Sequence, residues 1–321
     1  MRRLTAVTAA IASVTLALHA AADAGPPPER PSGKVVLSTL PPERVVVIDL
    51  GSGHAVEKRL PGGTLCHGPV VVTGGRIVYS GPAHGEPVAI GLGLRGHARS
   101  VVRSGIYVPS AIGGRLWIGE LRSNRWMDLR SLREVTLDGR TTLHARGVPP
   151  RGQSLDGALE DGLLFERGSR LRVWDPRLGR FTRRLAGTFP IAMHGRRVAW
   201  CRGGCKTLHL AGPEGDTRIR ALRSLPFGEG PGGAFSPNGR FLALRTGAAG
   251  RLALVDTVTR SVRPVPGARL GDYDAFGWSR DGRWLLVATP HGRLLAYRPG
   301  SDRPLVLPMR LHYSVMSVAG A

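Results

Sequence analysis

Short apolar runs dominate the chain from residue 34 to its end. Val, Leu, Ile, Trp and Tyr occur in groups of four to seven, and Gly, Pro, Asp and Asn separate the groups. No stretch keeps the 3.6-residue apolar period of an amphipathic helix. Many short runs with turn residues between them are typical of β-strands. The pattern therefore predicts an all-β protein with very little helix.

The predicted strands recur as a unit of about 40 residues. Each copy begins with a strand, a tight turn containing Gly and a second strand, and a further hairpin follows nearly every copy. An arginine follows the first turn in five copies, at separations of 39, 81, 44 and 43 residues, the longest of which spans a degenerate copy. These arginines are Arg76, Arg115, Arg196, Arg240 and Arg283. Four strands per 40 residues are typical of a β-propeller blade.

Two copies carry a more specific motif. Residues 235–244 read FSPNGRFLAL and residues 278–287 read WSRDGRWLLV. Both segments resemble the aromatic-Ser-Pro-Asp-Gly motif of TolB-like and WD-repeat-like β-propellers, and the other copies share the hairpin spacing alone. The resemblance implies a propeller fold in a secreted bacterial protein, and TolB-like relatives suggest protein partners. No binding residue of that family maps onto this sequence.

The number of blades follows from the ends of the chain. Six copies lie between residues 66 and 308, while residues 35–60 add a hairpin without inner strands of its own. Residues 312–320 form one further strand. Pairing the two ends would complete a seventh blade and remove the exposed edges of an open array. We therefore expect a single seven-bladed propeller closed by its terminal strands, with a six-bladed ring as the alternative.

The first 24 residues have the features of a secretory signal peptide. Arg2 and Arg3 precede an apolar stretch, and Ala22-Asp23-Ala24 is a small-x-small cleavage site, so we expect cleavage before Gly25. An uncleaved anchor is the alternative. No later run reaches 18 apolar residues, so no transmembrane segment is expected after cleavage. The predicted organisation is a signal peptide at 1–24, a Pro-rich leader at 25–33 and a propeller domain at 34–321.

Export permits disulfide bonds. Cys201 and Cys205 flank the sequence Arg-Gly-Gly between two strand-like runs, so a hairpin turn would bring their sulfur atoms within bridging reach. The sequence therefore predicts a Cys201–Cys205 disulfide. Cys66 is left over, as a buried thiol or as a reactive one. A metal site would need further ligands, and His209 alone follows, so no metal is predicted.

The charge is strongly positive. The chain has 45 Lys and Arg against 23 Asp and Glu, a net charge of +22, and 42 of the 45 are arginine. Such a bias is typical of a GC-rich genome, and the resemblance to TolB-like propellers described above implies a bacterial source of actinobacterial type. The few acidic residues still leave a field that attracts polyanions. The five repeated arginines should lie on one face, as a surface for anionic cell-wall polymers, anionic lipids or an acidic protein. Their alternative role is that of ordinary turn residues.

The opposite face should collect polar residues near the mouth of the central channel. These candidate ligand-binding residues are His67, Glu229, Asp272, Asp274, His312 and Tyr313. Carboxylates and imidazoles can bind a divalent cation or a polar ligand, and their alternative role is as ordinary loop residues. The sequence contains no catalytic or nucleotide-binding motif, so no catalytic residue and no cofactor are predicted.

Two functions fit these features. The first is a secreted, monomeric, non-catalytic propeller that binds an envelope protein or an anionic polymer. The second is an extracellular propeller enzyme, a hydrolase or lactonase, that uses the polar residues at the channel mouth. Nucleic acid is not an expected partner, because the chain is exported and lacks aromatic stacking motifs.

Overall fold

The structure is a computed structural model, and most of the chain after residue 28 is described. The described residues are 29–40, 44–59, 71–73, 76–83, 86–93, 98–102, 106–122, 128–168, 170–187, 189–201, 207–219, 232–247, 250–271, 275–311 and 314–320. The chain divides into two compact units, Met1–Arg30 and Pro31–Ala321. The second unit includes the last residues of the predicted leader, because Pro31 is buried and the amide of Leu50 donates to the carbonyl oxygen of Gly33 at 2.8 Å.

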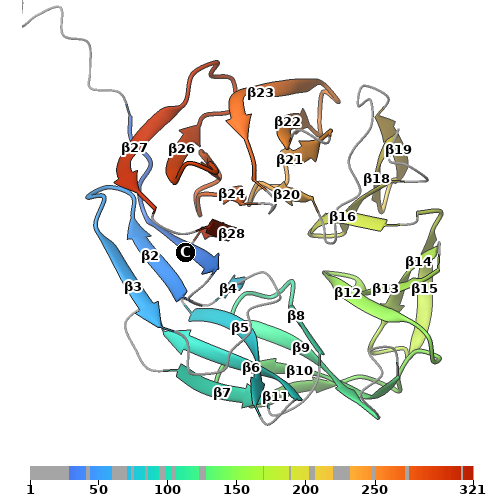
Figure 1. Cartoon of the computed structure of the whole chain (residues 1–321). Helices are drawn as coiled ribbons and strands as arrows, with labels where there is room; N and C mark the ends of the chain where they lie inside the picture. Colours follow the sequence, from blue (N-terminus) through green and yellow to red (C-terminus); the bar gives the residue numbers. More distant parts are fainter. Residues whose placement is uncertain are drawn as a thin grey trace, which may run out of the picture. The chain divides into compact units, whose positions relative to one another are not determined.

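The described strands of this second unit form seven four-stranded antiparallel sheets arranged as a ring (Figure 1). From the centre outward, the first three sheets contain β28 (Ser314–Gly320), β1 (Lys34–Leu40), β2 (Arg44–Asp49) and β3 (Ala55–Arg59); β4 (Val71–Thr73), β5 (Arg76–Ala83), β6 (Glu86–Gly93) and β7 (Ala98–Val102); and β8 (Ile106–Pro109), β9 (Arg115–Leu121), β10 (Leu129–Thr136) and β11 (Thr141–His144). No helix occurs among the described residues.

The other four sheets follow in chain order. They contain β12 (Ser154–Leu159), β13 (Gly162–Arg167), β14 (Arg170–Asp175) and β15 (Arg180–Leu185); β16 (Phe189–His194), β17 (Arg197–Cys201), β18 (Leu208–Gly212) and β19 (Gly215–Ile219); β20 (Gly233–Phe235), β21 (Phe241–Thr246), β22 (Arg251–Asp256) and β23 (Val262–Arg269); and β24 (Phe276–Trp278), β25 (Leu285–Ala288), β26 (Arg293–Tyr297) and β27 (Leu305–Arg310).

The all-β propeller predicted from the repeats is confirmed. Seven sheets among the described strands agree with the seven-bladed expectation rather than with the six-bladed alternative. The two ends of the chain share one sheet, in which β1 pairs with β28 and Val36 lies opposite Ala319. The expectation that the N-terminal segment lacks inner strands was wrong, because residues 34–40 form the second strand of this sheet. The C-terminal strand β28 contributes only the innermost strand of this sheet.

The hydrophobic core lies between neighbouring sheets. Each cluster of buried side chains joins residues of two successive blades, as Trp278 of β24 does when its indole Nε1 donates to the carbonyl oxygen of Ala234 in β20 at 2.9 Å. Five tryptophans are buried between blades, as large aromatic groups in a sheet-on-sheet interface should be. They are Trp117, Trp174, Trp200, Trp278 and Trp284.

The described residues contain no helix with the length and hydropathy of a membrane-spanning segment.

Antiparallel order gives every blade two distinct ends. The first and third strands begin, and the second and fourth strands finish, at the end where chain segments pass from blade to blade; we call this the loop end. The tight turns within the first and second hairpins lie at the opposite end, which we call the turn end. This division decides which charged side chains of different blades share a surface.

Candidate functional site

The six residues predicted to line the channel mouth lie outside the described residues. They are His67, Glu229, Asp272, Asp274, His312 and Tyr313. Cys205 and Cys66 also lie outside the described part, while Cys201 is buried at the end of β17. The polar ligand site and the Cys201–Cys205 disulfide therefore stay predictions.

The five arginines predicted to form a basic face lie at the turn end, at or just before the second strand of their blades. Their contacts with the protein itself include Arg115 with Glu134 at 3.0 Å, Arg240 with Asp256 at 3.5 Å, Arg196 with Asp161 at 3.6 Å, and Arg76 with the carbonyl oxygen of Leu137 at 3.2 Å. Arg283 also lies at this end, with an exposed side chain. These contacts hold turns and neighbouring strands together, and they leave less positive charge for an external anion.

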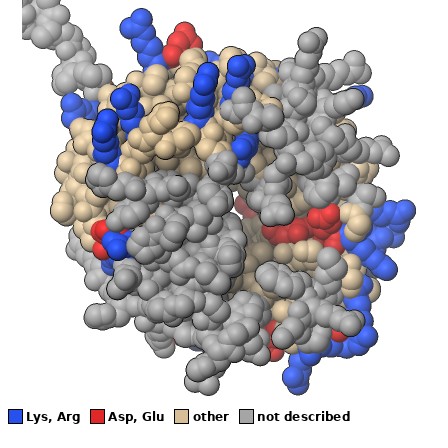
Figure 2. All heavy atoms as spheres, in the orientation of Figure 1, with Lys and Arg blue, Asp and Glu red and all other residues tan. Residues whose placement is uncertain are grey.

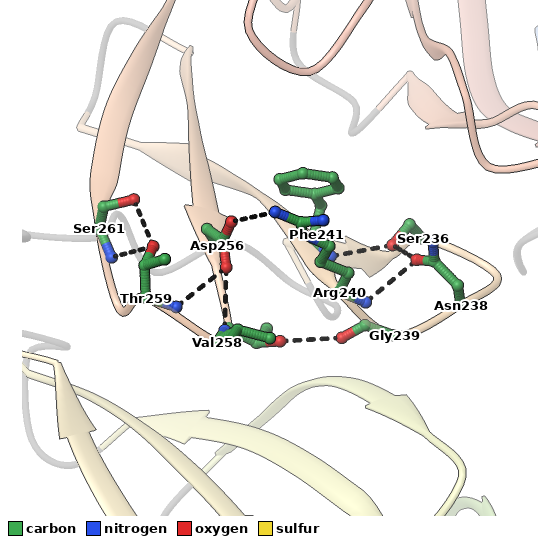
Figure 3. A network of polar contacts seen from close by, with 10 residues as sticks. Ser236, Asn238, Gly239, Arg240, Phe241, Asp256, Val258, Thr259 and Ser261 are labelled. Atoms are coloured by element: carbon green, nitrogen blue, oxygen red, sulfur yellow. Dashed lines mark hydrogen bonds and ion pairs between the residues drawn. The ribbon is translucent and has the colours of Figure 1, made fainter.

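The motif that resembles other propellers forms a closed network at one such turn (Figure 3). The hydroxyl of Ser236 donates to Asn238 Oδ1 at 2.7 Å and accepts from the amide of Phe241 at 2.9 Å. The amide of Arg240 donates to the same Asn238 oxygen at 3.1 Å. Gly239 between them has φ of +68°, a conformation that favours glycine.

The second copy of the motif repeats these contacts. Ser279 Oγ donates to Asp281 Oδ1 at 2.5 Å and accepts from the amide of Trp284 at 3.0 Å. Gly282 has φ of +70°. Both serines are fully buried, and each hydroxyl supplies an acceptor to a backbone amide, which is buried at Trp284 and partly buried at Phe241. The motif is thus explained by turn formation, and nothing in it requires a ligand.

A second set of arginines lies at the loop end, on the two outer strands. In blades β12–β15, β20–β23 and β24–β27, the dipeptide Arg-Leu occurs both at the start of the third strand and at the end of the fourth. The arginines are exposed, and the leucines are buried or half-buried. The arginines of this set are Arg170, Arg184, Arg251, Arg269, Arg293 and Arg310.

In the blade formed by β20–β23, Arg251 of β22 lies directly opposite Arg269 of β23. The amide of Leu270 donates to the carbonyl oxygen of Gly250 at 2.8 Å and closes the end of the strand pair. Gly250 has φ of +61°, and a Cβ at this position would lie 2.6 Å from the carbonyl oxygen of Leu270. A glycine is therefore required where the two strands approach most closely.

The next blade, β24–β27, contains the same arrangement. Arg293 of β26 lies opposite Arg310 of β27, and the amide of Leu311 donates to the carbonyl oxygen of Gly292 at 2.7 Å. Gly292 has φ of +71°. In both blades the register shifts immediately after the first arginine. We call Arg251/Arg269 and Arg293/Arg310 the arginine pairs.

The arginine pairs place like charges side by side. Directly opposite residues in an antiparallel sheet lie on the same face with Cα atoms about 5 Å apart, and like charges there destabilise the strand pair. Within the described part of the chain, none of the four guanidinium groups forms an ion pair. No carboxylate of the described residues therefore neutralises these charges.

The blade formed by β12–β15 has a related but modified pair. Arg172 lies opposite Arg184, but the guanidinium of Arg172 lies 5.3 Å from the ring centre of Phe181. Arg184 is exposed. A cation that packs on an aromatic ring is partly engaged, so this blade presents less available charge than the blades β20–β23 and β24–β27.

Acidic groups lie further inward. Asp156 is the extra residue of a β-bulge in β12, the innermost strand of its blade, because Leu155 and Gly157 pair with successive residues of β13. Burial and the charge of Glu166 raise the pKa of Asp156 to about 7, against a hydrogen bond with Ser154 that lowers it. Burial also raises the pKa of Glu166. Among the described residues Asp156 Oδ2 has no hydrogen-bond partner.

Charge is therefore separated between the rim and the centre of the ring. Figure 2 shows Lys and Arg side chains over β22–β27 and beside β14 and β15, and a group of Asp and Glu side chains beside the hollow near β12 and β16. No group of three or more His, Cys, Asp and Glu that fits a metal ion occurs among the described residues. The outer arginines form the candidate site that the described residues support best.

Comparison with known proteins shows similarity of fold. No family model and no curated protein matches the chain. Among solved structures, a protein of unknown function from Desulfotomaculum acetoxidans is 11% identical with a TM-score of 0.58, over 90% of this chain and 98% of that one. A chain of the mitotic checkpoint complex is 13% identical with a TM-score of 0.54, over 84% and 86%.

A third solved structure is a proposed 6-phosphogluconolactonase from Bacteroides fragilis. It is 10% identical with a TM-score of 0.52, over 92% of this chain and 99% of that one. At such identities a likeness extends to the fold and not to the activity. The chain is therefore similar to β-propeller proteins in architecture.

Proposed function

We propose that this chain is a secreted, non-catalytic β-propeller that binds an anionic polymer of the cell envelope through its arginine pairs. The observation that carries the proposal is the pairing itself. Arg251/Arg269 and Arg293/Arg310 oppose like charges on exposed outer strands, and no carboxylate within the described residues compensates them. A bound polyanion neutralises the two guanidinium groups of a pair. The free energy that their repulsion costs in the free protein is then recovered in the complex, which favours binding.

The distribution of the remaining charge supports the loop end as the binding surface. The net charge of +22 draws polyanions toward the molecule as a whole. At the turn end, however, Arg115, Arg196 and Arg240 already contact carboxylates of the protein. The arginine pairs are accordingly the stronger attachment point, and Arg76, Arg115, Arg196 and Arg240 serve mainly to hold turns and neighbouring strands together.

Retention of the purified chain on an envelope preparation tests this proposal. The binding variant replaces four arginines: Arg251→Gln, Arg269→Gln, Arg293→Gln and Arg310→Gln. The matched control removes the same charge from exposed arginines at the turn end: Arg177→Gln, Arg180→Gln, Arg263→Gln and Arg303→Gln. We expect the wild type and the control to be retained at low salt and the binding variant to be released. Equal retention of both variants would reject the arginine pairs as the attachment point.

Treating the preparation with a protease separates the polymer from an acidic envelope protein, which is the other partner class considered above. Retention that survives protease treatment supports a polymer. Retention that protease abolishes assigns the surface to a protein partner instead.

A second candidate function is an extracellular hydrolase or lactonase. One observation favours it, namely the carboxyl group of Asp156, which lies on an innermost strand and keeps its proton to about pH 7. A protonated carboxyl group near neutral pH is able to act as a general acid. Hydrolysis of lactone or ester substrates that Asp156→Asn abolishes would establish this function, and absence of turnover by the wild type would exclude it for those substrates.

A further inference from the structure

The arginine pairs have a geometry that distinguishes between classes of anion. We infer that each arginine pair binds one phosphate group, so that the anionic polymer of the proposed function carries its charges as phosphates. This inference rests on the proposed function and adds the chemistry of the charged group. It concerns Arg251/Arg269 and Arg293/Arg310.

The first step of the argument is the shape of the donors. A guanidinium group offers N–H donors in a planar fork, and one fork matches both oxygens of one carboxylate. A carboxylate that accepts from Arg251 with both of its oxygens has no second pair of oxygens to offer the fork of Arg269. A tetrahedral phosphate presents oxygens in several directions, so it accepts from both forks at once.

The second step is the fixed separation of the two forks. The hydrogen bond from the amide of Leu270 to Gly250 and the positive φ of Gly250 hold Arg251 opposite Arg269 at the end of the sheet. Opposed Cα atoms lie about 5 Å apart, a separation that one tetrahedral oxyanion between the two side chains can bridge. The backbone thus prepares the spacing of the pair before any ligand arrives, which lowers the entropic cost of binding.

The third step is the repetition of the pair. Blades β20–β23 and β24–β27 are neighbours in the ring, and buried side chains from both blades pack together in one core cluster. Each blade presents its pair at the loop end, with a glycine, a backbone hydrogen bond and a register shift at equivalent positions. A polymer with many phosphates can occupy both pairs, and the second contact then forms at a high effective concentration.

Titration calorimetry of the purified chain with inorganic polyphosphate and with poly-L-glutamate tests the inference. The two polymers are compared at equal ionic strength and equal concentration of negative charge. We expect polyphosphate to bind at least tenfold more tightly than polyglutamate. Equal affinity for the two polymers would overturn the phosphate assignment while leaving the proposed function intact, and failure of both to bind would count against the proposed function.

Two double variants test whether the pair is the binding unit. Arg251→Gln with Arg269→Gln removes one pair and leaves the other whole, whereas Arg251→Gln with Arg293→Gln breaks both pairs. The loss of formal charge is identical. If a phosphate needs both members of a pair, the second variant loses several-fold more affinity for polyphosphate than the first. Equal losses would show that charge alone matters, and the inference would fail.

Folding of the variants is checked by thermal unfolding. All four positions are exposed, so the substitutions remove no core packing, and relief of like-charge repulsion should leave the midpoint unchanged or slightly raised. A variant with a lowered midpoint is replaced by the corresponding lysine variant, which keeps the charge but not the fork. We expect lysine at both pairs to weaken polyphosphate binding and to leave polyglutamate binding nearly unchanged; equal weakening of both would contradict the inference.

Discussion

The amide of Leu270 donates to the carbonyl oxygen of Gly250 at 2.8 Å, and this single backbone contact fixes the end of the β22–β23 strand pair. Arg251 and Arg269, the residues next to them, therefore lie directly opposite each other. The backbone of this blade thus determines the relative position of its two exposed arginines. The same relationship between Leu311 and Gly292 places the second arginine pair.

Replacing Gly250 by alanine should disturb this contact. The new Cβ would lie 2.6 Å from the carbonyl oxygen of Leu270, and φ at this position is +61°. Gly247→Ala is the matched control, because Gly247 also has a positive φ but has nothing within 4 Å of the added Cβ. We expect the control to lose about 1 kcal/mol of unfolding free energy and Gly250→Ala to lose at least twice as much and to bind polyanions more weakly. Chemical denaturation measures the unfolding free energy of both variants. An equal loss of free energy in the two would show that the contact between the added Cβ and the carbonyl oxygen of Leu270 does not matter.

Asp156 should make stability depend on pH. Its pKa in the folded chain is about 7, above the ordinary value of 3.8, so the folded state holds more protons than the unfolded state between these values. The free energy of unfolding should therefore fall as pH rises from about 4 to about 7, by about 4 kcal/mol at most, and level off above. Asp156→Asn should remove this fall. Denaturant unfolding at a series of pH values measures the free energy of unfolding of the wild type and of the variant. The prediction would be refuted if this free energy changed with pH in the same way in both proteins.

Glu166 supplies a control for the same measurement. Its charge contributes to raising the pKa of Asp156. We expect Glu166→Gln to shift the fall in stability to lower pH without removing it. An unchanged profile would show that burial alone sets the pKa of Asp156.

The buried turn serines should contribute to stability and not to binding. Ser236→Ala leaves the partly buried amide of Phe241 without its side-chain acceptor, and Ser279→Ala does the same to the buried amide of Trp284. Each should cost about 1–3 kcal/mol. Ser261→Ala, at an exposed turn residue, should cost less than about 0.5 kcal/mol. Thermal unfolding gives the ranking, and retention on a polyanion should be the same for all three. A loss of retention in Ser236→Ala would show that the motif takes part in binding.

The fold was largely predictable from the sequence. Alternation of apolar runs with glycine turns and a period near 40 residues indicated a propeller, because each strand must bury one face and each tight turn needs a glycine such as Gly239. The closing sheet was predictable in outline from the unpaired C-terminal strand. The second strand, residues 34–40, was missed because it belongs to no hairpin repeat in the sequence.

The candidate site was less predictable. The arginines after the first turns stand out in the sequence, but the carboxylates that engage them, such as Asp256 for Arg240, become visible only when strands pair. The arginine pairs depend on the register between third and fourth strands, which β-bulges shift. The repeated Arg-Leu dipeptide was the available signal, since it marks an exposed residue next to a buried one at both strand ends. Asp156 was missed because its burial follows from a bulge.

The salt dependence of polyanion binding tests the central claim most directly. Affinity for polyphosphate is measured at several salt concentrations for the wild type, for the variant with glutamine at Arg251, Arg269, Arg293 and Arg310, and for the turn-end control with glutamine at Arg177, Arg180, Arg263 and Arg303. Loss of the two phosphates, one at each pair, should reduce the slope of log affinity against log salt concentration by about 1.5 in the first variant. The control should keep the slope of the wild type. A slope that falls equally in both variants would contradict a binding surface built from arginine pairs.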